Sequence, residues 1–114
     1  MSDTVTLSLT EATALSTAAL TANGADAENA RAVTDIMIRA ERDRCASHGL
    51  FRLPGYCASL KSGKVKGTAR PIASEIAPGA VRVSGDSGFA PLALEVGLPV
   101  LAKKAKSQGI AGMV

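Results

Sequence analysis

Helix start and stop signals near the N-terminus place the strongest constraint on the fold of this chain. The four residues from Ser8 to Glu11 match a capping box, in which the Ser8 hydroxyl accepts from the Glu11 amide and the Glu11 carboxylate accepts from the Ser8 amide. Asn23-Gly24 supplies a left-handed stop, so we expect the first helix to end near Ala22.

A second helix follows after a short connection. Asp26 is placed to cap it, and Glu28 lies in its first turn, where the helix dipole favours an acidic side chain. Its far end, residues 39–44, is strongly charged. The short connection predicts that the two helices pack as an antiparallel pair. Apolar residues at helical spacing form the expected buried face: Ala30, Val33, Met37 and Ala40.

A break and a short third helix are predicted next. Residues 45–50 favour irregular backbone, and Pro54 suits the first turn of a helix because the missing N–H would be unpaired there anyway. This helix would carry Tyr56 and Leu60 and would stop at Ser62-Gly63.

The second half of the chain predicts strands. Alternating residues indicate strands over 72–76 and 80–84, with a Pro78-Gly79 turn between them. Residues 110–114 are apolar and indicate the start of a buried strand. Because a free apolar strand is a liability, we expect the polypeptide to continue or a second chain to supply the rest.

A fourth helix is expected between these strands. It begins at Pro91 and reaches about Ser107, and Gly109 ends it. Gly97 and Pro99 lie inside this helix and are expected to bend or weaken it.

Composition narrows the class of protein. Apolar residues make up 46% of the 114 residues, but much of this is alanine and aromatic residues are scarce, so the core should be thin. The net charge of +3 is scattered and lacks the motif or aromatic-flanked basic stripe of a nucleic-acid-binding protein. The first residues lack the basic region and apolar stretch of a signal peptide, so we expect none. No apolar run approaches the length of a membrane span, so we expect a cytoplasmic protein.

His48 is the single histidine and the first candidate for chemistry. A lone histidine is more often structural than catalytic, but this one lies in a break between two helices, where sites are common. Ser47 precedes it, and Gly49 follows and lets other groups approach closely. Imidazole titrates near neutral pH and can therefore give a proton to a substrate oxygen or nitrogen.

Arg52 lies four residues after His48, so the two side chains would share a face if the chain between them were helical. A guanidinium binds a carboxylate with two parallel hydrogen bonds, and the alternative is a surface ion pair with the acidic end of the second helix. Tyr56 lies a further turn along and would either line the same pocket or be a half-buried tyrosine with a hydrated hydroxyl.

The cysteines and the glycine pairs do not match a known metal-binding or phosphate-binding pattern. Cys45 and Cys57 flank the histidine, but no carboxylate cluster accompanies them, so we assign no metal site and expect both thiols to be small buried hydrophobes. The glycine pairs Gly85…Gly88 and Gly109…Gly112 complete neither a Rossmann fingerprint nor a P-loop. If a dinucleotide binds to this protein, either it does not bind through the common doubly wound motif, or its site lies in sequence outside this chain.

Residues 40–56 resemble the malate/L-lactate dehydrogenase family, which lacks a Rossmann fold. The resemblance rests on an acidic helix end followed by Ser47-His48-Gly49 and then arginine, proline and tyrosine at this spacing, and it extends over nearly the whole chain. It implies an α+β fold. Residues 1–66 would form an N-terminal helical region with the Ser-His-Gly site, and residues 67–114 would begin a mixed-sheet α/β cofactor domain that is incomplete in this chain.

The resemblance also implies an oxidoreductase that uses NADPH or NADH. His48 would be the proton donor, Ser47 would orient it or relay to it, Arg52 would bind the substrate carboxylate, and Tyr56 would form a pocket wall. Residues 88–94 look most like the cyclic-imine reductase branch, which implies reduction of Δ1-pyrroline-2-carboxylate or Δ1-piperideine-2-carboxylate to proline or pipecolate. A malate/lactate-type 2-hydroxy-acid dehydrogenase is the alternative.

The same resemblance implies that this chain is one part of a longer protein. Family members are several-fold longer, and their main cofactor-binding segments follow the position of Val114, so we expect the 114 residues alone to be inactive. Family members are typically dimers, so the resemblance also implies a homodimer. Two hypotheses of other kinds remain open. One is a non-catalytic helical interaction module, and the other is a catalytically inactive paralogue that serves as a scaffold.

Overall fold

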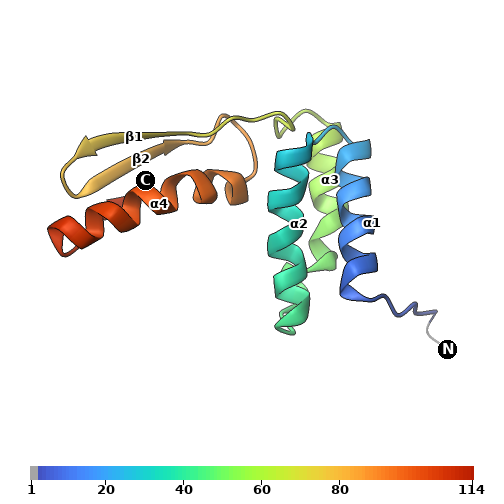
Figure 1. The fold of residues 1–114 in the computed structure, drawn as a ribbon. Helices are drawn as coiled ribbons and strands as arrows, with labels where there is room; N and C mark the ends of the chain where they lie inside the picture. The colour runs from blue at the N-terminus through green and yellow to red at the C-terminus, as the bar shows by residue number, and fades with distance from the viewer. Residues whose placement is uncertain (1–2) are drawn as a thin grey trace.

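The computed structural model describes residues 3–114, which form a helical lobe followed by a sheet arm (Figure 1). This arrangement confirms the predicted α+β class. The helical lobe contains α1 (Leu9–Ala22), α2 (Ala27–Arg42) and α3 (Leu53–Lys61), with the short 3₁₀ helices η1 (Ala46–His48) and η2 (Leu50–Arg52) between α2 and α3. The sheet arm contains β1 (Ile72–Ala77), β2 (Ala80–Ser84), α4 (Ala90–Gln108) and β3 (Gly112–Met113).

The predicted helix caps are confirmed. At the start of α1, the Glu11 amide donates to Ser8 Oγ over 3.0 Å and the Ser8 amide donates to Glu11 Oε2 over 2.7 Å. The chain leaves α1 through Gly24, whose φ of 112° requires the freedom of glycine. Asp26 then caps α2 by accepting from the Asn29 amide over 3.0 Å. These local bonds fix both helix boundaries where the sequence patterns predict them.

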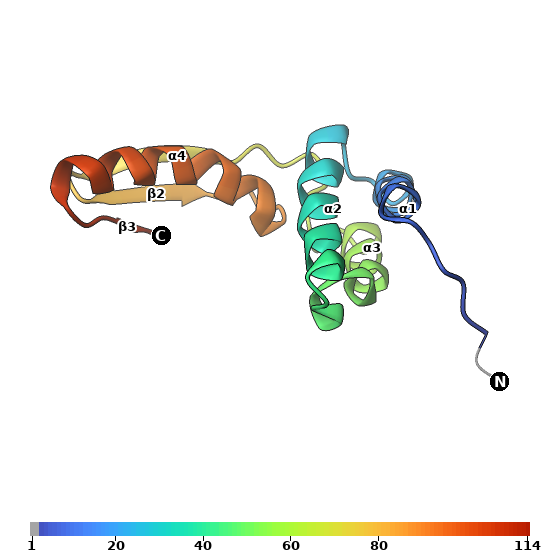
Figure 2. The same cartoon turned by 60° about the horizontal axis from the view of Figure 1, so that its bottom comes forward.

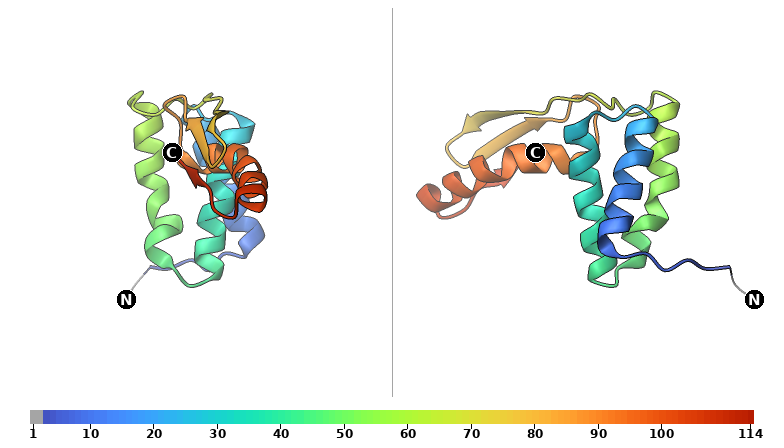
Figure 3. Two further views of the ribbon diagram at one scale, coloured as in Figure 1. Left: turned by 90° about the vertical axis from the view of Figure 1, so that its left-hand side faces the viewer. Right: turned by 45° about the vertical axis from the view of Figure 1, so that its right-hand side comes forward.

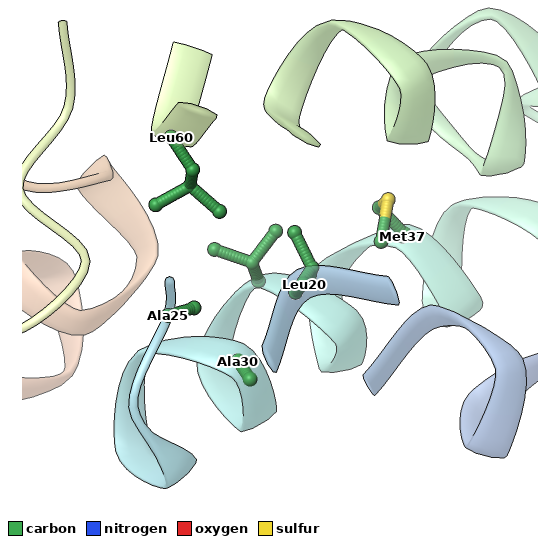
Figure 4. Close-up of a cluster of buried hydrophobic side chains, with 6 residues drawn as sticks. Leu20, Ala25, Ala30, Met37 and Leu60 are labelled. Carbon is green, nitrogen blue, oxygen red and sulfur yellow. The ribbon is translucent and has the colours of Figure 1, made fainter. Parts of the chain in front are cut away.

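The core of the helical lobe lies between its three helices (Figure 4). The predicted face of α2 is confirmed, with Ala30, Val33 and Met37 buried and Ala40 half-buried. Because two of the six core residues are alanines, the helices approach closely and the core stays small. The buried cluster consists of Leu20, Ala25, Ala30, Val33, Met37 and Leu60.

The sheet arm is a mixed sheet with α4 packed on one face (Figure 2). β1 pairs with β2 in antiparallel fashion, and β2 pairs with β3 in parallel. Gly97 of α4 is buried against the sheet, and a Cβ at this position would lie 2.6 Å from Val83 Cγ2. This glycine therefore lets the helix approach β2 closely.

The predicted extent of α4 is confirmed, and the helix continues through Gly97 and Pro99 to Gln108. Gly97 is used for close packing, and Pro99 lies on the exposed side. The expected bend or weakening at these two residues stays a prediction. The expected start of a strand over residues 110–114 is confirmed, but within the described residues this strand is not buried. β3 is a two-residue strand at the edge of the sheet, and Ile110 and Val114 are 83% and 76% exposed.

The lobe and the arm together make an elongated molecule (Figure 3). Its extents are 57 × 30 × 19 Å, and its radius of gyration is 16.3 Å, against about 13 Å for a compact domain of this length. Contacts between arm and lobe include the bond from the Asp26 amide to the Gly67 carbonyl over 2.9 Å and the ion pair of Arg31 in α2 with Glu95 in α4 over 2.7 Å. The predicted division between residues 66 and 67 stays a prediction. No helix within residues 3–114 is both long and apolar enough to cross a membrane.

Candidate active site

The candidate residues lie in the connection between α2 and α3, residues 43–52, which we call the site loop. Figure 1 shows this green connection at the end of the helices away from the chain that leads into the sheet arm. α2 ends in a Schellman motif, in which the Cys45 amide donates to the Ala40 carbonyl over 2.7 Å and the Arg44 amide to the Glu41 carbonyl over 3.1 Å. Arg44 takes the left-handed position, with φ of 59°, where glycine is usual.

The predicted break is two 3₁₀ turns. Gly49, with ψ of −136°, separates η1 from η2, so His48 and Arg52 do not share the face of a continuous helix. The side chain of Arg52 instead turns back over the loop, and its Nε donates to the Ser47 carbonyl over 2.8 Å. The structure thus gathers Ser47, His48 and Arg52 by a loop closure rather than by helical spacing.

Ser47 and His48 form a hydrogen-bonded pair. Ser47 Oγ lies 2.9 Å from His48 Nδ1, and both side chains are exposed. Because Nδ1 is occupied, Nε2 is the ring nitrogen left for another group. Cys45 Sγ lies 4.0 Å from the same Nδ1 and is exposed, so the expectation that this thiol is buried is wrong. The Schellman motif carries Cys45 out of the helix toward solvent, whereas Cys57 is partly buried beside the core as expected.

The guanidinium of Arg52 lies beside an exposed aromatic ring. Its Cζ is 5.9 Å from the centroid of Phe51, which is 75% exposed. Within residues 3–114 neither Nη of Arg52 has a hydrogen-bond or ion-pair partner, so the alternative ion pair with the end of α2 is not formed there. Ala46, Ser47 and Phe51 line a shallow hollow at this surface. A cation with two available donors therefore lies next to an apolar hollow.

Tyr56 is directed elsewhere. Its ring packs edge-on against Phe89, with centroids 5.2 Å apart and an interplanar angle of 63°, beside the core of the helical lobe. The structure therefore brings Ser47, His48 and Arg52 into one loop and places Tyr56 against the junction of lobe and arm.

Glu41 is the residue that the sequence patterns missed. Its Oε1 accepts from the Leu50 amide over 2.8 Å, which ties the end of α2 to the site loop. The sequence pattern that marks Glu41 is the charged end of the second helix, where one acidic residue looks like its neighbours. Only the fold of the loop distinguishes it.

The glycine pairs do not fit a phosphate cradle. The Gly85–Gly88 turn presents the carboxylate of Asp86, which accepts from the Arg70 amide and from Lys66 Nζ, both over 2.9 Å. These two contacts hold the pKa of Asp86 below its usual value, so the turn carries negative charge. Gly109 follows the C-terminal end of α4, where the helix dipole disfavours an anion. No group of three potential metal ligands gathers within residues 3–114.

The helical lobe, the mixed sheet and the Ser-His-Gly loop match one family along almost the whole chain. A model of the malate/L-lactate dehydrogenase family matches residues 7–114, so the chain belongs to that family.

Individual relatives agree with the family. A Δ1-pyrroline-2-carboxylate reductase of Pseudomonas fluorescens is 42% identical over 114 residues, which are 100% of this chain and 34% of that protein. A Δ1-pyrroline-2-carboxylate/Δ1-piperideine-2-carboxylate reductase of Pseudomonas aeruginosa is 52% identical over 83 residues, covering 73% of this chain and 25% of that protein.

A solved structure repeats the fold. The crystal structure of Δ1-piperideine-2-carboxylate reductase from Pseudomonas syringae pv. tomato matches with a TM-score of 0.90 at 36% identity, over 97% of this chain and 33% of that one. Nearly all of this chain is matched, but it spans only about a third of the length of these relatives.

Proposed function

We propose that the protein containing this chain reduces a small cyclic 2-imino acid, Δ1-pyrroline-2-carboxylate or Δ1-piperideine-2-carboxylate, to proline or pipecolate. In this proposal the site loop supplies the substrate-binding and proton-donating half of the site. The observation that carries the proposal is the 2.9 Å hydrogen bond between Ser47 Oγ and His48 Nδ1, next to the two available donors of Arg52. The names of the similar reductases support the substrate class.

His48 would donate the proton. In its imidazolium form Nδ1–H donates to Ser47 Oγ, and Nε2–H remains for the substrate nitrogen. Hydride addition to the imine carbon breaks the C=N π bond, and the nitrogen takes the proton from Nε2. Ser47 then keeps the remaining proton on Nδ1, which fixes the orientation of the ring through the transfer.

Arg52 would hold the substrate carboxylate. Its Nε is bound to the Ser47 carbonyl, so the two Nη groups are left to face an anion with parallel hydrogen bonds. The same Nε contact fixes Arg52 relative to His48, because Ser47 contacts both side chains. Tyr56, expected as a pocket wall, is left out of this proposal because its ring packs against Phe89 at the junction of lobe and arm.

A nicotinamide cofactor, NADPH or NADH, supplies the hydride when bound. The described residues do not form a cradle for its phosphates, so we assign it no contact in this chain. We also propose a cytoplasmic homodimer. The family resemblance supports the dimer, and the two free cysteines suit a reducing compartment.

The test is a steady-state assay of the natural protein with each cyclic imine, with pyruvate and oxaloacetate, and with both cofactors. His48→Ala is expected to lower kcat by about 10²–10⁴-fold, the usual contribution of a positioned general acid. Arg52→Ala should mainly raise KM, because it removes a carboxylate contact. Cys45→Ala is the matched control, since it removes a neighbour of the same nitrogen and should leave the rate unchanged.

Three results would contradict the proposal. Full activity of a folded His48→Ala variant excludes the assigned proton donor. Reduction of 2-oxo acids without reduction of imines replaces the proposal with a 2-hydroxy-acid dehydrogenase. The absence of any response to NADH or NADPH in a thermal-shift titration favours a binding module or an inactive scaffold.

A further inference from the structure

One acidic side chain reaches into the site loop from outside it. Glu41 lies in the last turn of α2, and its Oε1 accepts from the amide of Leu50, nine residues later, over 2.8 Å. Within residues 3–114, Glu41 is the one side chain outside the site loop that hydrogen-bonds to the backbone of residues 45–52. A carboxylate that accepts from an amide makes one of the stronger types of hydrogen bond, and this one is partly buried.

Gly49 makes this contact possible. It is buried although His48 on one side and Leu50 on the other are more exposed. A Cβ at residue 49 would overlap the Glu41 side chain, lying only 2.7 Å from its Cγ and closer still to its carboxylate. The glycine after His48 therefore makes room for Glu41 of the same chain.

Little else fixes the position of the site loop. Ser47, His48, Phe51 and Arg52 are all exposed, so apolar packing does not hold them. The first three residues of the loop are bonded to the end of α2 by the backbone, through the Schellman motif. The other backbone hydrogen bonds of the loop are short-range bonds of its two 3₁₀ turns and the bond from Arg52 Nε, which moves with the loop. Beyond Cys45, the Glu41–Leu50 bond is the hydrogen bond that relates the described loop backbone to α2.

We propose that Glu41 is the positioning residue of the site: through the Leu50 amide it holds the peptide that follows His48-Gly49, and so sets where the imidazole stands relative to the Arg52 guanidinium. This inference rests on the proposed function, because Glu41 acts through His48. It adds a residue and a contact that the reaction itself does not involve.

Two variants of Glu41 separate the hydrogen bond from the charge. Glu41→Gln keeps a carbonyl oxygen that accepts from the Leu50 amide, whereas Glu41→Ala removes the acceptor. In the natural protein, Glu41→Ala is expected to lower kcat by about 10–100-fold with a smaller change in KM, because displacement of a catalytic group by about 1 Å has an effect of this size. Glu41→Gln should restore kcat to within about threefold of the wild-type value.

Gly49→Ala reaches the same bond from the other side. The new methyl group would push the Glu41 carboxylate away from Leu50, so this variant should lose kcat to the same extent as Glu41→Ala. The double variant should lose little more than either single variant, because both changes break one contact. A purely structural role would instead lower thermal stability and leave kcat unchanged at a temperature where the protein is folded.

Wild type and His48→Ala are assayed beside these variants. An inactive wild type or an active His48→Ala would overturn the proposed function and this inference with it. With wild type active and His48→Ala inactive, a wild-type kcat in Glu41→Ala would overturn the inference alone. So would a Glu41→Gln variant as slow as Glu41→Ala, because the acceptor would then be present without effect.

Discussion

The helical lobe and the sheet arm differ in how completely they bury their apolar side chains. In the lobe, three helices enclose a shared core in which Leu20 and Met37 are almost fully buried. In the arm, one helix covers one face of a narrow sheet, and the buried residues there are few, with Val81 the most enclosed. Large apolar side chains remain exposed on both parts. On the lobe they include Leu9, Leu15, Ile36 and Phe51. On the arm, which has fewer buried ones to set against them, they are Ile72, Ile76, Leu94, Leu98, Ile110 and Val114.

This difference bears on the site. The site loop is attached to the lobe, which forms its own core, and Glu41 ties it to α2 within that lobe. The geometry of Ser47 and His48 therefore depends on contacts inside the lobe and not on the packing of the arm. The substrate half of the proposed site can be preformed while the arm keeps apolar surface for other contacts.

The largest effect is expected when one leucine in each region is replaced by alanine. Leu20→Ala in the lobe removes a fully buried side chain, so we expect a loss of about 2–5 kcal/mol in the free energy of unfolding. Leu98→Ala in the arm removes a side chain that is 49% exposed, and the expected loss is below about 1 kcal/mol. Urea titration followed by far-UV circular dichroism measures both. Equal losses would show that the arm is packed as tightly as the lobe.

The lobe is also the region that sequence patterns predict best, for a physical reason. Its boundaries are set by local bonds, such as those of Ser8 with Glu11, that depend on residues three or four positions apart. Its buried face follows from the 3.6-residue period of α2. The arm depends on close approach between distant residues, so Gly97 looks like a helix breaker in the sequence and is a packing contact in the structure.

The candidate site also has features that follow from local sequence and features that follow only from the fold. Ser47, His48 and Arg52 were predictable as residue types near one another in the chain, but the way they meet was not. The expected shared helix face is replaced by a bond from Arg52 Nε to the Ser47 carbonyl. The left-handed Arg44 and the contact from Glu41 could not be predicted, because neither position carries a residue that is distinctive for its role.

Glycine substitutions give a second, smaller contrast. Gly97→Ala in the arm would place a methyl group against Val83 and Met113, so we expect a loss of about 1–3 kcal/mol in the free energy of unfolding. Gly55→Ala in the lobe is the matched control, because nothing lies within 4 Å of its new Cβ. In α3 this change should stabilise the chain by about 0.5–1 kcal/mol. A stabilising effect of Gly97→Ala would contradict the tight approach of α4 to β2.

The smallest change in the free energy of unfolding is expected for substitutions at the junction of the two regions. Asp26 caps α2 in the lobe, and its Oδ2 lies 2.8 Å from Nη1 of Arg70, which precedes the sheet. Partial burial tends to raise the pKa of Asp26, but hydrogen bonds from Asn29 and Arg70 outweigh it and lower the pKa below its usual value. The stability that Asp26 contributes is therefore present above about pH 4, the usual aspartate range. It is lost as the pH falls through the lower folded-state pKa.

Asp26→Asn tests this junction without removing the cap, since asparagine caps a helix about as well as aspartate. We expect a loss of less than about 1 kcal/mol at neutral pH, because Arg70 is more than half exposed and solvent screens the pair. The acid-dependent fall in stability below about pH 4 should become shallower than in the wild type, as measured by urea midpoints across pH. Arg70→Gln removes the partner from the arm and should give the same loss at neutral pH. If both variants kept the wild-type midpoint at neutral pH, the Asp26–Arg70 ion pair would contribute nothing to holding arm and lobe together. The other contacts between them would then carry the junction, among them the backbone bond from Asp26 to Gly67 and the ion pair of Arg31 with Glu95.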